Sequence, residues 1–177
     1  MTPAPKPDSE ALRLAALYRT LLLDTPPEQR FDRIVRFAAS AFEVPIALVS
    51  LVDRDRQWFK ARVGLDTCET ARDVSFCGHT ILRSEVLVVE DASADDRFAD
   101  NPLVTGDPFV RFYAGAPLEL GTGERVGTLC LIDRRPRWFD PIDAGILASM
   151  ATLVVEEIER RLEGSTASPG QDERAAR

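Results

Sequence analysis

Apolar residues recur at helical spacing in three stretches of the chain. This pattern predicts helices over residues 8–23, 25–42 and 140–163, each with one face able to pack against other elements. Thr25 and Glu28 have the spacing of a capping box, and a proline stands at the first helical position after Thr25. The second helix is therefore expected to begin at Thr25.

Other stretches are short, apolar and rich in branched side chains, which is typical of strands. They are expected at residues 45–53, 57–63, 86–90, 113–120 and 125–133. A polar turn joins the first two, and the glycine-containing segment Gly121–Glu124 joins the last two, so both pairs are predicted to be hairpins. Antiparallel pairs with helices before and after them predict an α+β fold, in which a sheet packs against helices.

The two ends of the chain differ from its middle. Residues 1–7 carry three prolines and are predicted to be a flexible arm. Residues 164–177 have almost no apolar side chain to bury, which predicts a disordered tail. Residues 8–163 contain no repeat and no linker, so they are interpreted as one domain.

Composition and charge narrow the function classes. The 177 residues are 45% hydrophobic and 29% charged, which suits one globular domain with a real core. The net charge is −7 and the basic residues are dispersed among acidic ones, so no nucleic-acid partner is expected. No stretch has the apolar length of a membrane span or a signal peptide. Three scattered cysteines, Cys68, Cys77 and Cys130, are expected to be reduced thiols in the cytoplasm.

Seven short phrases of the sequence, spread over about residues 12–160, resemble one known family in content and order. They are Leu22–Thr25, Ile46–Asp53, Val74–Leu82, Val89–Ala92, Asp96–Pro102, Phe112–Leu118 and Gly127–Asp133. Together with the order of the predicted elements, they resemble the GAF domain family, in particular the stand-alone or N-terminal GAF modules of bacterial signalling proteins.

The resemblance implies a central, mostly antiparallel sheet of five to six strands. It places the terminal helices on one face, and short helices and loops that roof a pocket on the other. It also implies a non-catalytic sensory module that binds a small molecule or a signalling protein. In dimeric members the first and last helices form a bundle, so a homodimer that signals through these helices is expected. The family's ligands include cyclic nucleotides, bilins, haem and small metabolites, and the resemblance leaves the choice among them open.

Cys77 and His79, the one histidine of the chain, bring a thiol and an imidazole close in sequence. If a short helix begins at Ser75, Cys77 lies in its first turn, where backbone amides favour the thiolate. His79 is two residues further on and would point to the other side of that helix, so the spacing does not support a Cys–His nucleophile pair. The expected role of Cys77 is a packed, buried thiol.

An enzymatic alternative comes from free methionine-R-sulfoxide reductases, which are GAF domains with a Cys-Gly step like Cys77–Gly78. Their chemistry needs a second, resolving thiol close to the first. The further cysteine of that family is missing from residues 101–111, and Cys130 falls inside a predicted strand. Cys68 could act as the resolving thiol in principle. The non-catalytic sensor is therefore preferred, with the thiol reductase as the alternative.

The pocket is expected under residues 75–83 and the irregular stretch 92–111, because long irregular loops in compact domains are usually lids or binding loops. The candidate ligand contacts are Phe76, Cys77, His79, Phe98, Arg111 and Tyr113. Arginines could hold the phosphate of a cyclic nucleotide, and aromatic rings could line its base. The alternative roles are ion pairing for the arginines and ordinary core packing for the aromatic residues. No catalytic residue, metal site or required cofactor is predicted. Phytochrome-like members of the family attach a bilin through a cysteine that is followed directly by a histidine. This chain has no such pair, so a bilin is not expected.

Overall fold

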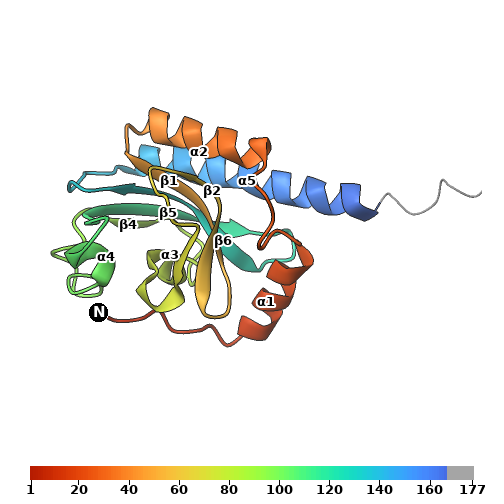
Figure 1. The fold of residues 1–177 in the computed structure, drawn as a ribbon, viewed down its shortest axis with the longest axis horizontal. Helices are drawn as coiled ribbons and strands as arrows, with labels where there is room; N and C mark the ends of the chain where they lie inside the picture. The colour runs from red at the N-terminus through yellow and green to blue at the C-terminus, as the bar shows by residue number, and fades with distance from the viewer. Residues whose placement is uncertain (167–177) are drawn as a thin grey trace, which may run out of the picture.

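A six-stranded sheet divides the molecule into two layers (Figure 1). The computed structural model describes residues 1–166. The strands are β1 (Ile46–Val52), β2 (Arg56–Val63), β3 (Glu69–Ala71), β4 (Leu87–Val89), β5 (Phe112–Glu119) and β6 (Arg125–Asp133). Their order across the sheet is β3-β2-β1-β6-β5-β4, and every neighbouring pair is antiparallel. The predicted α+β class and antiparallel sheet are confirmed, and β3 comes from a segment where the pattern predicted no strand.

Both faces of the sheet are buried. Successive side chains of a strand point to opposite faces, so alternate residues of β1 enter different layers. Val49 and Leu51 pack in the hydrophobic core on one face, whereas Ile46 and Leu48 pack in the core on the other. All seven residues of β1 are buried. This explains why the segment is apolar apart from Ser50 and shows no polar alternation.

Helices cover the two faces unequally. They are α1 (Glu10–Arg19), α2 (Gln29–Ala41), the 3-10 turn η1 (Arg72–Val74), α3 (Phe76–Thr80), α4 (Pro102–Thr105) and α5 (Pro141–Thr166). Figure 1 shows α2 and α5 together on one face, while the short α3 and α4 lie on the other. Helix α1 lies at the end of the sheet and joins the α2–α5 core through Leu14 and Leu17. No helix of the described residues is long and apolar enough to cross a membrane.

The second helix does not begin at Thr25, so the predicted capping box is wrong. Helix α2 begins at Gln29, after Glu28 in an extended conformation. The Thr25 hydroxyl donates to the carbonyl oxygen of Leu22 at 2.6 Å and accepts from Lys60 Nζ at 2.7 Å, so it is not free to cap a helix. Two consecutive prolines follow Thr25, and a residue before proline disfavours the helical region, which delays the helix.

The outer ends of the terminal helices also differ from the prediction. Helix α1 ends at Arg19, before the expected residue 23, because Leu21 adopts a positive φ of 52° that no α-helix continues through. Helix α5 continues to Thr166, so the first residues of the predicted disordered tail, residues 164–166, are helical. The rest of that predicted tail lies outside the described residues.

Residues 1–7, which the sequence predicts to be a flexible arm, lie in this structure against α3 and the loop before α4. The backbone amide of Thr2 donates to the carbonyl oxygen of Arg97 at 3.2 Å. The carbonyl oxygen of Thr2 lies 3.0 Å from His79 Nε2. A methyl group added at Gly78 would come within 3.2 Å of the Ala4 side chain. In this conformation the arm packs on the outside of the α3 layer.

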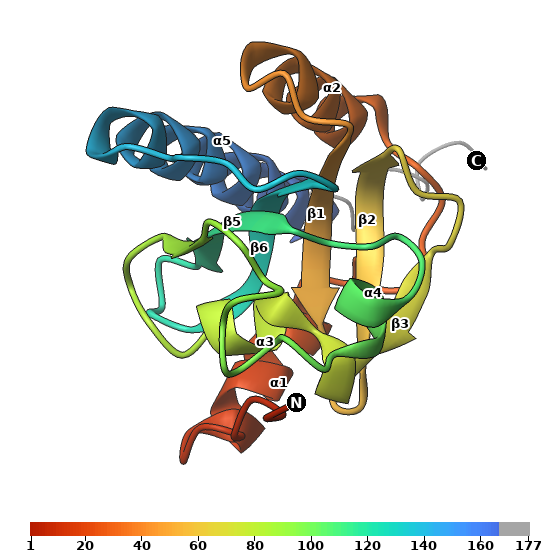
Figure 2. The same cartoon turned by 90° about the vertical axis from the view of Figure 1, so that its left-hand side faces the viewer.

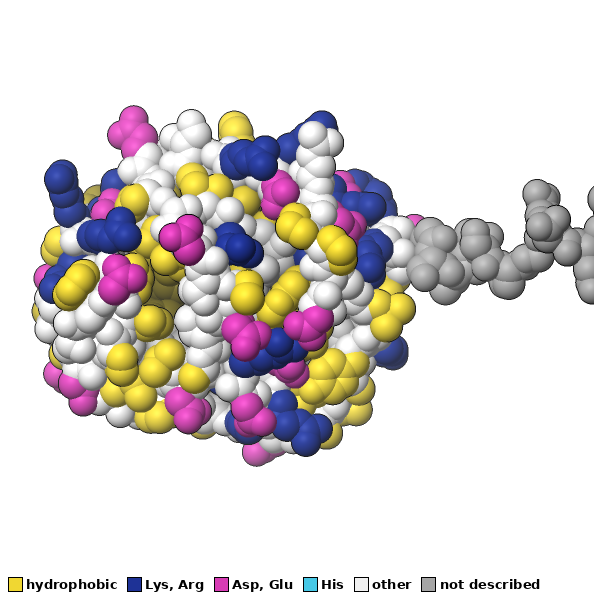
Figure 3. All heavy atoms as spheres, in the orientation of Figure 1, with side chains coloured by type: hydrophobic (Ala, Val, Ile, Leu, Met, Phe, Trp, Pro, Cys, Tyr) yellow, Lys and Arg dark blue, Asp and Glu magenta, His cyan; other side chains and the backbone are white. Residues whose placement is uncertain are grey.

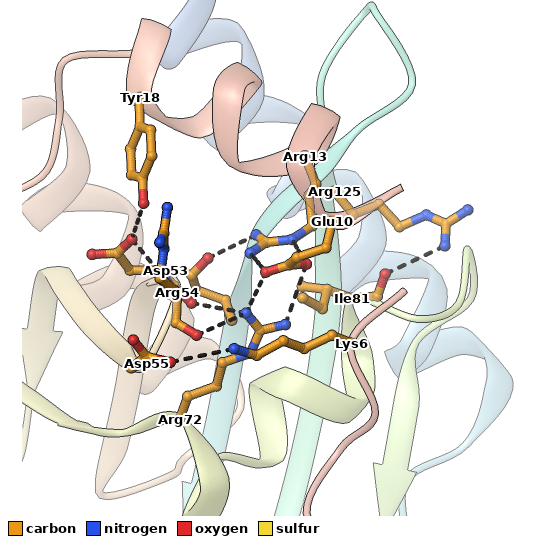
Figure 4. A network of polar contacts seen from close by, with 11 residues as sticks. Lys6, Glu10, Arg13, Tyr18, Asp53, Arg54, Asp55, Arg72, Ile81 and Arg125 are labelled. Atoms are coloured by element: carbon orange, nitrogen blue, oxygen red, sulfur yellow. Dashed lines mark hydrogen bonds and ion pairs between the residues drawn. The ribbon is translucent and has the colours of Figure 1, made fainter. Parts of the chain in front are cut away.

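A buried charge network fastens α1 to the sheet (Figure 4). The Glu10 carboxylate accepts two hydrogen bonds of 2.8 Å from Arg13 and two further ones from Arg72. Arg13 also donates to the carbonyl oxygen of Val52 at 2.7 Å, and Arg72 to that of Asp53 at 3.0 Å. Both arginine side chains are 3% exposed. One carboxylate therefore bridges two buried guanidinium groups and joins α1, the end of β1 and η1.

We expect E10Q to lower the free energy of unfolding at pH 7 by about 2 kcal/mol, because it leaves two buried arginines with a weaker acceptor. Burial alone would raise the pKa of the Glu10 carboxyl. The hydrogen bonds from Arg13 and Arg72 have the larger, opposite effect, and the net result is a decrease of this pKa from 4.5 to about 2. A lowered folded-state pKa stabilises the fold above the unfolded pKa and loses this effect as pH falls. The stability gap between wild type and E10Q should therefore narrow between pH 4.5 and about 2.

Urea denaturation at several pH values measures this gap. The exposed-glutamate variant E90Q is the control and should match the wild type at pH 7. A wild-type-to-E10Q difference that stays constant over this pH range would contradict the assigned role of Glu10.

Candidate functional site: a cavity under the short helices

A cavity of about 250 Å³ lies between the sheet and the α3–α4 layer. Figure 2 shows α3 and α4 in front of the strands, and Figure 3 shows a hollow with hydrophobic side chains in the same region. The apolar lining residues are Leu48, Phe59, Leu65, Phe76, Leu103, Pro108, Val110, Tyr113 and Ile132. The other lining residues are Gln57, Thr67, Thr70, Cys77 and Asp107. This is the face on which the sequence predicts a pocket.

Gln57 anchors the roof of the cavity to the sheet. Its side-chain oxygen accepts from Ser75 Oγ at 2.7 Å and from Ser50 Oγ at 3.2 Å, and its nitrogen donates to Thr70 Oγ1 at 2.7 Å. Ser75 Oγ in turn accepts from the amide of Gly78 at 3.0 Å, which caps the N-terminus of α3. The start of α3 is therefore fixed to β1 and β2 by buried hydrogen bonds.

Two thiols meet beside the cavity. Cys77 Sγ, on α3, lies 3.8 Å from Cys130 Sγ, on β6. The Thr128 hydroxyl donates to Cys77 Sγ at 3.1 Å, and the Tyr113 hydroxyl lies 3.5 Å from the same sulfur. Tyr113 is also 2.7 Å from Thr80 Oγ1. The sulfur of Cys77 is thus surrounded by hydroxyl groups and a second thiol.

These neighbours separate the acidities of the two thiols. Burial raises the pKa of Cys77, but hydrogen bonds from Cys130, Thr128 and Tyr113 lower it to about 6. The hydrogen bond to Cys77, together with burial, raises the pKa of Cys130 well above its usual value. Of the two thiols, Cys77 is therefore the more acidic.

Gly115 makes room for the tyrosine of this cluster. It lies two residues after Tyr113 on β5, on the same face of the sheet. A Cβ atom at Gly115 would lie 2.1 Å from the Tyr113 hydroxyl. Glycine at this position therefore allows the Tyr113 hydroxyl to reach Thr80 and Cys77.

The structure brings together three of the six predicted contacts. Phe76, Cys77 and Tyr113 line the cavity, whereas His79, Phe98 and Arg111 are absent from its lining. Phe98 is buried and stacks on Phe76, with ring centroids 4.0 Å apart. His79 faces the N-terminal arm, where burial lowers the pKa of its imidazole. Arg111 donates to the backbone oxygens of Val104 and Val110, at 2.9 and 3.0 Å.

Sequence reasoning missed Cys130 as the neighbour of Cys77. A signal was present, because Thr128, Cys130 and Ile132 alternate along a predicted strand and so share one face. That face turns toward α3, and its neighbours Leu129 and Leu131 belong to the opposite core. Gln57 was missed because the presence of a polar residue in a strand does not indicate which side chains it will contact.

Among the described residues, no group of three or more His, Cys, Asp or Glu side chains could hold a metal ion. The site is therefore described by its cavity and its thiol pair.

The fold agrees with comparisons to known proteins. The model of the GAF domain matches residues 26–158. The chain belongs to the GAF domain family. It is 44% identical over 161 residues to cyclic di-GMP phosphodiesterase PA2567 of Pseudomonas aeruginosa, and this match covers 89% of the chain. The chain spans 27% of the length of that relative.

Solved structures share the GAF fold. The GAF domain of an Acinetobacter phosphoenolpyruvate-protein phosphotransferase superposes with a TM-score of 0.64 at 18% identity, covering 94% of this chain and 99% of that one. A free methionine-R-sulfoxide reductase from Neisseria meningitidis, solved with its substrate, has a TM-score of 0.61 at 20% identity, covering 94% and 98%. At these identities the similarity supports the fold alone.

We expect iodoacetamide to label Cys68 before the other two cysteines at neutral pH. Cys68 is exposed, whereas Cys77 and Cys130 are 3% and 0% exposed, so the reagent meets the Cys68 sulfur from many more directions than it meets the other two. Timed alkylation with peptide mapping should give a labelling rate at Cys68 that is at least tenfold higher than the rates at Cys77 and Cys130. In unfolded protein, the control, the three cysteines should be labelled at similar rates. Labelling of Cys77 first would show that the low pKa of its thiol outweighs its burial.

Proposed function

We propose that this GAF domain is a non-catalytic sensory module that binds a small, largely apolar molecule in its cavity. The observation that carries the proposal is a preformed cavity with mostly apolar walls and a few polar groups, the usual character of a small-molecule site. Its volume of about 250 Å³ is below the roughly 300–1,000 Å³ of drug-sized sites. Apolar cavities of about 150 Å³ accept benzene, so a molecule of one or two rings is a suitable size.

The polar groups of the wall favour a ligand that donates hydrogen bonds or carries a positive charge. Asp107 is acidic, the Thr67 hydroxyl already donates to the carbonyl oxygen of Glu69 at 2.8 Å, and Gln57 is engaged by its neighbours. No Lys or Arg appears among the described lining residues, so the phosphate of a cyclic nucleotide would lack a cationic partner. Arg97, in the loop before α4, pairs with Asp95 at 2.6 Å.

The sheet offers a route from the cavity to the terminal helices. Leu48 lines the cavity, and its neighbour Val49 packs in the core under α2 and α5. A ligand that displaces β1 or β6 would change the packing of α5, since cores respond to small shifts in volume. A ligand with different affinity for the two packing arrangements would then shift their populations.

We infer that the output is a homodimer formed through the exposed face of α5. Ile142, Ile146 and Leu153 are 72%, 46% and 50% exposed, and their spacing of four and seven residues is that of a coiled-coil seam. Val154 and Ile158 are fully buried in the domain core. They support the fold, so the face formed by Ile142, Ile146 and Leu153 is the dimer surface.

The proposed regulatory role is compatible with the match to the cyclic di-GMP phosphodiesterase PA2567. The chain matches 27% of that protein, so its printed activity does not assign catalysis to this domain. We place the module in the cytoplasm, where its three free cysteines would stay reduced.

A thiol reductase is the second candidate, and the Cys77–Cys130 pair is the observation that favours it. The two sulfurs are 3.8 Å apart at the cavity, which meets the requirement for a nucleophilic and a resolving thiol. Turnover of free methionine-R-sulfoxide coupled to NADPH oxidation would establish this activity, and its absence would leave the sensor.

We expect the cavity to bind benzylamine more tightly than benzoate, because the acidic Asp107 lies in a wall without a cationic side chain. Calorimetric titration of each compound should show at least a tenfold preference for the amine, and D107N should reduce this preference severalfold. L103W, which fills the cavity, should abolish binding of both, while L12W, on exposed α1, should leave it intact. Equal binding to wild type and L103W would contradict the cavity as the site.

We expect the double variant I146E/L153E to be monomeric where the wild type is dimeric, because it places charges in the apolar seam of α5. Light scattering at tens of micromolar measures the mass. F109E, at an exposed apolar residue on the cavity side, is the control and should stay dimeric. A monomeric wild type at this concentration would contradict the dimer.

A further inference from the structure

We propose that Cys77 and Cys130 are a reversible oxidation site, in which hydrogen peroxide converts the two thiols to an intramolecular disulfide in the wall of the cavity. This proposal is independent of the small ligand and of the dimer. It starts from a geometric fact, which is the approach of two free thiols from α3 and β6 to 3.8 Å.

The distance is suited to bond formation without rebuilding the fold. A disulfide requires about 2.05 Å between its sulfurs, so the pair must close by roughly 1.8 Å. Both sulfurs are in side chains that one torsion can move, and Cys77 lies in a five-residue helix beside a cavity, where the packing has room to adjust. Cys130 is in the central strand β6 and supplies the fixed partner.

The two thiols have different access, which assigns their order of reaction. Cys77 lines the cavity, so a molecule as small as hydrogen peroxide can reach its sulfur from there. Cys130 is 0% exposed and does not line the cavity. Cys77 is therefore the peroxide-reactive thiol, and Cys130 is the resolving thiol.

The surroundings of Cys77 Sγ suit the first step. The Thr128 hydroxyl at 3.1 Å and the Tyr113 hydroxyl at 3.5 Å can stabilise a negative sulfur. The Cys77 thiolate attacks one peroxide oxygen, the O–O bond breaks, and the departing hydroxide takes the proton that the thiol released. The products are a sulfenic acid on Cys77 and one water.

The second step closes the disulfide. Cys130 sulfur attacks the sulfenic sulfur of Cys77, the S–O bond breaks, and hydroxide leaves with the Cys130 proton as a second water. The two sulfurs lose two electrons in total, and one hydrogen peroxide is reduced to two waters. Two equivalents of a reducing thiol, or one dithiol, restore the pair by thiol–disulfide exchange through a mixed disulfide and are themselves oxidised to a disulfide.

The test uses the C68S chain, which removes the exposed thiol and its intermolecular disulfides. Purified C68S protein is treated with a small excess of hydrogen peroxide, unfolded in an alkylating reagent and analysed by intact mass and peptide mapping. We expect a product about 2 Da lighter that takes up no alkyl group, with a Cys77–Cys130 linked peptide that dithiothreitol removes.

Further variants assign the roles. C68S/C130S should stop at a sulfenic or sulfinic acid on Cys77. In C68S/C77S, Cys130 should be oxidised at least tenfold more slowly than the thiol pair of the C68S chain. If either variant fails to fold, mapping of the C68S chain still decides the proposal. Sulfinic acid on Cys77 without a linked peptide in that chain, or no oxidation of Cys77 before unfolding, would overturn it.

Discussion

The burial of the sheet on both faces is the constraint on which the rest of this structure depends. Because β1 is covered on both sides, its side chains are apolar except for Ser50 and alternate between two separate cores. One core is filled by the long helices α2 and α5, which present continuous apolar faces. The other is covered by α3 and α4, with five and four residues, and the loops between them. Elements this short cannot fill the layer, so the cavity lies on their side.

A layer built from short elements needs polar anchors, and Gln57 provides them. A helix of five residues gains little from its own hydrogen bonds, since helix nucleation is unfavourable. The hydrogen bonds from Ser75 and Ser50 to Gln57, and from the Gly78 amide to Ser75, hold α3 in a fixed position over β1 and β2. This positions Cys77 one residue into the helix, directly above β6. The site therefore follows from a buried amide in a strand and a capping serine.

The sequence predicts the layers of the fold well and the contacts between individual side chains poorly, for physical reasons. The apolar runs at 45–53 and 125–133 have strong periodic signals, so β1 and β6 are predicted nearly to their ends. The start of α2 is mispredicted because the Thr25 side chain is taken by Lys60, a partner 35 residues away. A position inside a predicted strand argues against Cys130 as a resolving thiol. Yet the alternation of side chains along that strand directs Cys130 toward Cys77. Arg111 and Phe98 were assigned to the pocket by residue type, and their backbone and ring partners hold them elsewhere.

Strand β6 links the chemistry of the cavity to the surface of the domain. Cys130 and Ile132 face the cavity layer, and the intervening Leu131 packs in the core that contains Val154 and Ile158 of α5. Strand β6 pairs with β1 on one side and with β5 on the other. A displacement of its backbone therefore changes the packing on both faces of the sheet. A ligand that displaces β6 would act on α5 through this shared strand, which is the route of the proposed signal. The difference in free energy between the two packing arrangements sets how far such a shift can move the population.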